Sequence, residues 1–188
     1  MTSPLLADHV RESVLRYVPS DARETAFRKR MLSLCDAPEP FARTVVSPGH
    51  FTASAFVLSP ELDRLLLIFH KKLGRWLQPG GHIETSDATV LAAARREVEE
   101  ETGLAGTEPA TSGPFDIDVH AIPARPDEGA HEHFDLRVLL VASDDGVIAS
   151  DEVAAVRWVP LDEIEAVGTD DSVKRALRKI EDWRRGQR

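Results

Sequence analysis

The first forty residues contain two stretches in which apolar positions recur with helical spacing. In the first stretch these positions are Leu6, Val10, Val14 and Tyr17. Pro19 interrupts the pattern, and Asp21 with Glu24 has the spacing of a capping box that begins a second helix. The second helix would turn four residues inward, Phe27, Met31, Leu34 and Cys35. Because Pro38 ends it, we expect residues 1–40 to form a helical arm.

Beyond residue 50 the pattern changes to short runs rich in Phe, Val, Ile and Leu, separated by turn-forming residues. These runs predict strands over residues 51–58, 64–70, 116–122, 134–141 and 153–159. A helix is predicted between strands at 88–102, and another at 172–188 with an apolar stripe formed by Val173, Leu177, Ile180 and Trp183. This order of elements indicates an α/β domain in which helices cover a mixed sheet.

Composition limits the classes of function. The 188 residues include 42% hydrophobic and 29% charged positions, which is typical of a globular domain. A formal charge of -9 opposes binding to a nucleic-acid polymer. The chain has no apolar run near the ~20 residues that span a membrane. A single cysteine, Cys35, and an amino terminus without signal-peptide character favour a cytoplasmic protein.

A glycine loop leads into the helix predicted at 88–102. Gly80 and Gly81 open the loop, Asp87 is the expected N-cap, and Gly103 is the expected C-cap. On a helical wheel the buried stripe would consist of Val90, Leu91, Ala94 and Val98. This arrangement defines the face against which the acidic residues of the helix are placed.

Three carboxylates, those of Glu97, Glu100 and Glu101, border this buried stripe, whereas Glu99 points toward solvent. An acidic helix face opposite the core would be an ordinary solvated surface. Like charges beside the core instead oppose one another's ionisation, and a divalent cation removes that conflict. Carboxylate oxygens suit Mg²⁺ or Mn²⁺. The helix therefore predicts a metal site.

These residues resemble the Nudix box of the Nudix hydrolases. The segment 96–104, Arg-Glu-Val-Glu-Glu-Glu-Thr-Gly-Leu, matches the second half of the box at every specified position. In the first half, Asp87 occupies the place of the first glutamate. Eight residues, rather than the seven of the pattern, separate it from Arg96, so one residue is inserted. The departure favours an N-capping role for Asp87 and leaves the second half of the box intact.

The resemblance implies a fold, a domain organisation and a chemistry. The expected fold is a Nudix-type α/β/α sandwich with a mixed sheet, and the arm of residues 1–40 precedes a Nudix domain at 41–188 that includes the C-terminal helix. The implied Mg²⁺ ligands are Glu97, Glu100, Glu101 and the carbonyl oxygen of Gly80. Arg96 would orient Glu100 through an ion pair. Clustered metal ions would neutralise phosphate charge and activate a water molecule.

The general base is left open by the residues. Glu97 is the candidate within the box, and Glu128 or Glu132 is the candidate in a later loop. His131, His133 and Asp135 alternate and would share one strand face, where they could bind zinc, pack or contact substrate. Asp116, Asp118 and His120 alternate in the same way, without an assigned role.

The implied substrate is a nucleoside diphosphate linked to another moiety, with a nucleoside diphosphate sugar such as ADP-ribose as first choice. This choice goes with a homodimer, because the helical arm and a strand pair offer an interface. The alternatives are a nucleoside triphosphate or damaged-nucleotide pyrophosphatase, and a non-catalytic nucleotide-binding regulator. Trp76 could pack in the core or stack on a base. The candidate phosphate contacts are the cationic residues near the expected site mouth, although most of them are expected to be ordinary surface cations: Arg43, Lys71, Lys72, Arg75, Arg125 and Arg137.

Overall fold

The computed structural model describes the chain apart from residues 1–3, 72, 125–128, 152 and 188. The chain divides into two compact units, each made of separate stretches of sequence. The first unit comprises residues 1–54, 80–94 and 111–138, and the second comprises residues 55–79, 95–110 and 139–188. A mixed sheet with flanking helices and an N-terminal helix pair confirms the predicted α/β class.

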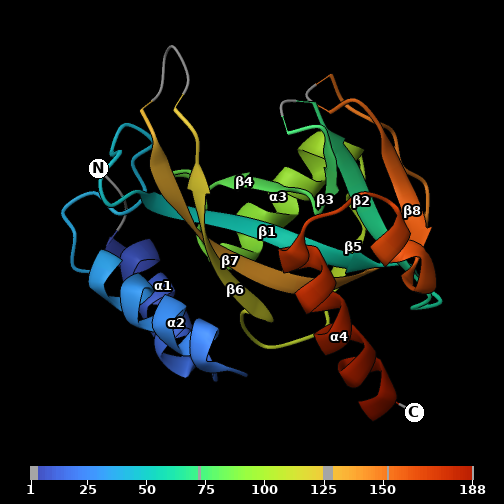
Figure 1. Cartoon of the computed structure of the whole chain (residues 1–188), viewed down its shortest axis with the longest axis horizontal. Coiled ribbons are helices and arrows are strands. Elements are labelled where there is room, and N and C mark those ends of the chain that lie inside the picture. Colours follow the sequence, from blue (N-terminus) through green and yellow to red (C-terminus); the bar gives the residue numbers. More distant parts are fainter. Residues whose placement is uncertain (1–3, 72, 125–128, 152, 188) are drawn as a thin grey trace. The chain divides into compact units, whose positions relative to one another are not determined.

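Helices α1 (Pro4–Arg16) and α2 (Ala22–Leu34) form the predicted arm and lie side by side in the first unit (Figure 1). All four apolar positions predicted for the first helical stretch are buried. Asp21 caps α2 by accepting a hydrogen bond from the Glu24 amide over 2.8 Å. Arg28 of α2 donates to the carbonyl oxygens of Val14 and Leu15 at 2.9 and 2.6 Å, which satisfies the carboxyl end of α1.

The second helix differs from its prediction in two details. Met31 and Leu34 are buried, but Phe27 and Cys35 are only half-buried. The carboxylate of Glu24 is fully buried and accepts from the Ser20 amide at 2.8 Å. It also accepts from the Tyr17 hydroxyl at 2.8 Å, so the same carboxylate holds the turn between the two helices.

Four strands contribute to the first unit: β1 (His50–Leu58), β4 (Gly80–His82), β6 (Asp116–Ile122) and β7 (His131–Ala142). Strand β4 pairs antiparallel with β1, so that Thr52 lies opposite His82. Strands β6 and β7 form an antiparallel hairpin in which His120 lies opposite His133. Since β1 also neighbours β7, the strand order in this unit is β4-β1-β7-β6.

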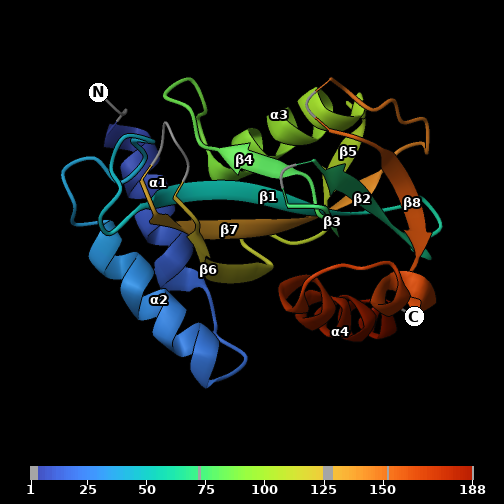
Figure 2. The ribbon, with the colours of Figure 1, turned by 45° about the horizontal axis from the view of Figure 1, so that its top comes forward.

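The second unit is built around β2 (Arg64–His70), which pairs with β3 (Arg75–Leu77) and β8 (Val156–Pro160). Figure 2 shows β2 and β8 side by side. Strand β5 (Thr107–Pro109) pairs with the end of β7. A 3₁₀ helix η1 (Leu161–Ala166) and helix α4 (Asp171–Gly186) follow β8, and α4 buries Val173, Leu177 and Ile180 of its predicted stripe while Trp183 is half-buried.

Strand prediction failed mainly for the shortest elements. Strands β3, β4 and β5 have three residues each, too few to produce an alternating pattern. Strand β7 begins at His131 rather than 134, and β8 begins at Val156 rather than 153. Within the described residues, no helix is long and apolar enough to cross a membrane.

Candidate functional site

Helix α3 (Val90–Thr102) carries the predicted acidic cluster along an edge of its buried face. Glu101 is buried with 8% of its surface exposed, Glu97 is half-buried, and Glu100 is exposed. Positions 97 and 101 are one turn apart and therefore share one side of the helix. Glu99 is exposed, as predicted. The three carboxylates thus run from the core edge of α3 to solvent.

Arg96 joins two of these carboxylates. Its Nη1 atom donates to Glu97 Oε1 over 3.0 Å and to Glu100 Oε2 over 2.9 Å. The predicted i, i+4 ion pair between Arg96 and Glu100 is therefore present. A partly exposed pair of this kind stabilises a helix by only ~0.3–0.5 kcal/mol. Its main physical effect is to fix where the two carboxylates point.

The predicted start of α3 was wrong by two residues. Asp87 is not the N-cap: its Oδ2 accepts from the Glu84 amide at 2.8 Å and closes the preceding turn. Thr89 caps the helix instead, because its hydroxyl accepts from the Ala92 amide at 3.0 Å. The buried face is also rotated relative to the wheel. Ala93 is fully buried while Leu91 is half-buried, and this rotation brings Glu101 into the buried face.

Gly80 lies in the first unit, at the start of β4 opposite Ser54 of β1. A Cβ atom at this position would lie 2.2 Å from the Ser54 Cβ, so only glycine permits this approach of the two strands. The α3 carboxylates belong to the second unit. A shared role for the Gly80 carbonyl and these carboxylates therefore stays a prediction.

Glu128 and Glu132 are the candidate general bases outside the box, and the structure describes only one of them. Glu128 lies outside the described residues, as do the candidate phosphate contacts Lys72 and Arg125. Glu132 forms an ion pair with Arg30 of α2, and Arg30 also lies over the Phe134 ring at 5.3 Å. Since side chains alternate along a strand, Glu132 faces the opposite side of β7 from His131 and His133.

The first unit contains a cluster of five histidines from four strands, which we call the histidine cluster. Its members are His50 of β1, His82 of β4, His120 of β6, and His131 and His133 of β7. The ring centroid of His50 lies 4.9–5.0 Å from those of three other members. His50 and His131 are buried, and the other three are half-buried. The sequence pattern indicated His131 and His133 but missed His50 and His82.

Burial and the neighbouring histidines disfavour the protonated form of His133. Desolvation by burial lowers the pKa of His133 to about 2, and repulsion from His120, His50, His82 and His131 adds to this effect. His133 is therefore a neutral imidazole near pH 7, with one ring nitrogen that donates and one that carries a lone pair.

Asp135 is on the same face of β7 as His131 and His133, but its hydrogen-bond partners are other residues. Its carboxylate accepts from the hydroxyls of Thr52 and Ser54 at 3.1 and 2.7 Å, and from Arg137 Nε at 2.8 Å. Of the three alternatives for His131, His133 and Asp135, a zinc site that includes Asp135 is thus not supported by the contacts of Asp135. Instead, Asp135 belongs to a buried charge network.

Arg137 is the centre of that network and is almost fully buried. Besides Asp135, its guanidinium donates to Asp118 at 3.3 Å and to Asp116 at 3.4 Å. Burial opposes the charge of Arg137, but attraction to Asp135, Asp118 and Asp116 outweighs this and raises its pKa. The suggestion that Arg137 contacts substrate phosphate is wrong, because three carboxylates already occupy a guanidinium that is 2% exposed.

Two further candidates for a binding role are Trp76 and a hollow on the surface. Trp76 packs edge-on against Phe69 at 5.4 Å, and Arg157 lies over its ring at 4.8 Å, so contacts within the chain account for its position.

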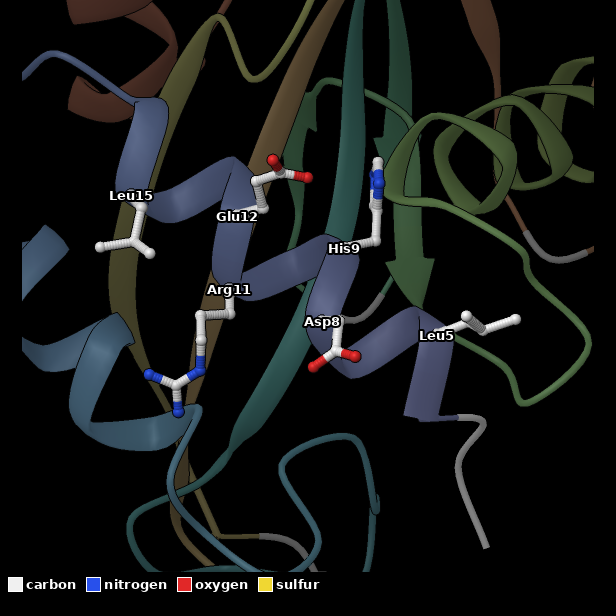
Figure 3. A pocket seen from close by; sticks show the side chains of 6 residues that line it. All are labelled: Leu5, Asp8, His9, Arg11, Glu12 and Leu15. Carbon is white, nitrogen blue, oxygen red and sulfur yellow. The ribbon is translucent and has the colours of Figure 1, made fainter.

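The hollow shown in Figure 3 is lined by residues of α1 alone: Leu5, Asp8, His9, Arg11, Glu12 and Leu15. Since it unites no groups from different elements, it offers little catalytic geometry.

Comparison with known protein families shows to which family the chain belongs. The family model of the NUDIX domain matches residues 48–180, which include Gly80, all of α3 and the five histidines. The chain belongs to the Nudix family. It is therefore a hydrolase that acts on anhydrides in phosphorus-containing compounds, and Nudix hydrolases generally use a divalent metal ion. The arm formed by α1 and α2 precedes the matched region.

Solved Nudix structures share the fold at low sequence identity. A NUDIX-family hydrolase from Clostridium perfringens has a TM-score of 0.57 and 21% identity, over 70% of this chain and 96% of that chain. An Ap4A hydrolase from C. elegans has a TM-score of 0.56 and 18% identity, over 76% and 99%. The NUDIX domain of Shewanella oneidensis NrtR, complexed with ADP ribose, has a TM-score of 0.51 and 19% identity, over 78% and 92%. No curated protein matches the sequence.

Proposed function

We propose that this Nudix hydrolase cleaves a phosphoanhydride bond in a nucleoside diphosphate linked to another moiety, with Mg²⁺ as its cofactor. The first-choice substrate is a nucleoside diphosphate sugar such as ADP-ribose. The observation that carries the proposal is the arrangement on α3, where Arg96 holds Glu97 and Glu100 and where Glu101 lies one turn from Glu97.

The residues of α3 fit a hard divalent cation. Glu97, Glu100 and Glu101 offer carboxylate oxygens from adjacent turns, which is the donor chemistry that Mg²⁺ and Mn²⁺ prefer. The helix is anchored by its buried residues Val90, Ala94 and Val98, so the backbone beneath these donors is rigid. The carbonyl oxygen of Gly80 is the proposed fourth protein ligand.

Each side chain has a proposed role. When bound, the metal ion offsets phosphate charge and lowers the pKa of a bound water molecule. Glu97, half-buried at the core edge, is the proposed general base within the box. Arg96 is a positioning residue, because its contacts orient Glu97 and Glu100. For a nucleoside diphosphate sugar, hydrolysis between the phosphorus atoms gives a nucleoside monophosphate and a sugar phosphate.

The choice of substrate class rests on two supports. The NrtR domain with the same fold was solved with ADP ribose, which is a nucleoside diphosphate joined to a second moiety. The α1–α2 arm supplies a surface through which two chains could pair, and we propose a homodimer. Light scattering on the purified chain tests the dimer, and a monomer at micromolar concentration would contradict it.

The activity itself is tested with a substrate panel and matched variants. Nucleoside diphosphate sugars, dinucleotides and nucleoside triphosphates are incubated with the wild type and Mg²⁺, and products are separated by ion-exchange chromatography. Glu100→Gln and Glu101→Gln should each lose most activity while their circular dichroism stays unchanged. Glu99→Gln is the control, because this exposed residue of the same helix lies outside the proposed site. Full activity in both site variants would defeat the proposed metal ligands, and preferential cleavage of triphosphates would replace the proposed substrate class.

A further inference from the structure

We propose that His50, His82 and His133 form a second metal site, specific for a divalent transition-metal ion with the ligand preference of Zn²⁺. These residues come from β1, β4 and β7 of the first unit. Each offers one ring nitrogen, and the three nitrogens lie within 4.8 Å of one another. This site shares no residue with the proposed Mg²⁺ ligands and does not depend on the proposed substrate.

The strand registers explain why the three histidines meet. His82 lies opposite Thr52 in the β1–β4 ladder, and His50 is two positions before Thr52 on the same face. The hydrogen bonds from Thr52 and Ser54 to Asp135 place this face of β1 beside the corresponding face of β7, on which His133 lies. Three neighbouring strands therefore direct imidazoles to one position, and rigid strands hold ligands more precisely than loops.

The donor set selects the class of metal. Imidazole nitrogens suit zinc and other late first-row ions, whereas Mg²⁺ requires oxygen donors. Three histidine ligands with a fourth position left for water is an established zinc geometry. The ring nitrogens need to move by no more than about 1–2 Å from their present separations to coordinate one ion at the usual Zn–N length of about 2.0–2.1 Å. Half-burial of His82 and His133 gives the ion a route from solvent.

A hydrogen-bond relay prepares His133 for ligation. His131 Nδ1 lies 2.9 Å from the Gly129 carbonyl oxygen, which can only accept, so Nδ1 is the donor and in this tautomer Nε2 is an acceptor. His131 Nε2 lies 3.2 Å from His133 Nε2, which must then be the donor. The lone pair of His133 is consequently on Nδ1. Ligand histidines in proteins usually donate their other N–H in this way, and such partners fix the tautomer.

Ordinary packing accounts less well for this cluster. A single buried histidine needs no explanation beyond packing, because buried polar groups in proteins are normally hydrogen-bonded. Here four strands contribute five imidazoles to one region, and ring centroids of neighbouring members are 4.9–5.6 Å apart. Coordination to one cation uses the lone pairs of three of these rings at one position.

The test measures metal binding rather than catalysis. The full chain, freed of any tag and stripped with a chelator, is titrated with Zn²⁺ against a chromophoric competitor in excess Mg²⁺. We expect one tight equivalent per chain. His82→Gln and His133→Gln should each weaken Zn²⁺ affinity by more than about a hundredfold, since loss of a residue that only hydrogen-bonds to a ligand costs about 10–100-fold. His131→Gln, which removes the relay, should fall within that smaller range.

Two control variants distinguish binding at this site from binding elsewhere on the chain. His9→Gln, on α1, should retain the wild-type Zn²⁺ affinity, because His9 lies outside the histidine cluster. Glu101→Gln should also retain it, whatever happens to hydrolysis, so the two proposals fail independently. Unchanged Zn²⁺ binding in both His82→Gln and His133→Gln, or no tight equivalent in the wild type, would overturn the site. X-ray absorption of the Zn²⁺-loaded wild type provides a check without mutation: three imidazole nitrogens support the site, and an all-oxygen shell contradicts it.

Discussion

Arg96 and Glu100 lie one turn apart on α3, and the Arg96 Nη1 atom donates to Glu100 Oε2 over 2.9 Å. The same nitrogen donates to Glu97, so one guanidinium orients two of the three proposed metal-binding carboxylates. The side chain of Glu100 is 53% exposed, and the energy of its ion pair is therefore small because water screens it. Loss of the Arg96 side chain should therefore change the orientation of the two carboxylates, and with it activity, while it changes the stability of the fold only slightly.

Replacing Arg96 with glutamine should lower kcat/KM by about 10–100-fold, because misplaced catalytic groups lose orientation. The free energy of unfolding should change by less than about 1 kcal/mol. Arg95→Gln is the control on the same helix, since Arg95 donates to the Thr107 carbonyl rather than to the box carboxylates. Steady-state kinetics and urea unfolding measure the two quantities. An Arg96→Gln enzyme with wild-type kcat/KM would contradict the positioning role.

Arg137 should affect stability rather than chemistry. Replacing it with methionine leaves the buried carboxylates of Asp116, Asp118 and Asp135 without their shared cation. Removing one partner of a buried ion network costs about 3–5 kcal/mol. Urea unfolding at pH 7 measures the loss, with Arg178→Met as the exposed control on α4. A loss below about 1 kcal/mol would show that the network contributes little to the native state.

Cys35 should react slowly in the folded chain. Burial raises the pKa of its thiol from 9.0 to about 11, and thiolate is the reactive form. At pH 8 the folded chain should therefore alkylate about a hundredfold more slowly than the urea-unfolded chain, and its rate should rise about tenfold per pH unit toward pH 11. Iodoacetamide labelling followed by mass spectrometry measures both rates. Equal rates in the folded and unfolded chains at pH 8 would contradict the raised pKa.

The same shift fixes the sign of the contribution of Cys35 to stability. The folded-state pKa lies above the unfolded value, so the folded chain holds the proton more tightly. This contribution is fully present below pH 9 and is lost as the pH rises through about 11. The direction is opposite to that of a carboxylate stabilised by a nearby cation.

The sequence by itself determined the elements whose patterns are local and long. Helical spacing predicted α1 and α2, and apolar runs bounded by turn-forming residues predicted β2 and β6 with their observed bounds. The segment 96–104 also indicated the Nudix family, which the family model confirmed. Such signals can be read locally because each repeats over several turns or residue pairs and reflects one buried face.

Only the tertiary structure decided which polar residues meet. His50 and His82 join His133 through strand pairings between segments far apart in the chain, and a register shift of one residue would turn them to the other face. The same pairings bury Arg137 among three aspartates, although its sequence context suggested a surface cation. Pairing and register depend on the burial of whole sheet faces. The histidine cluster and the charge network are therefore properties of the fold, whereas the box carboxylates are already aligned by one helix.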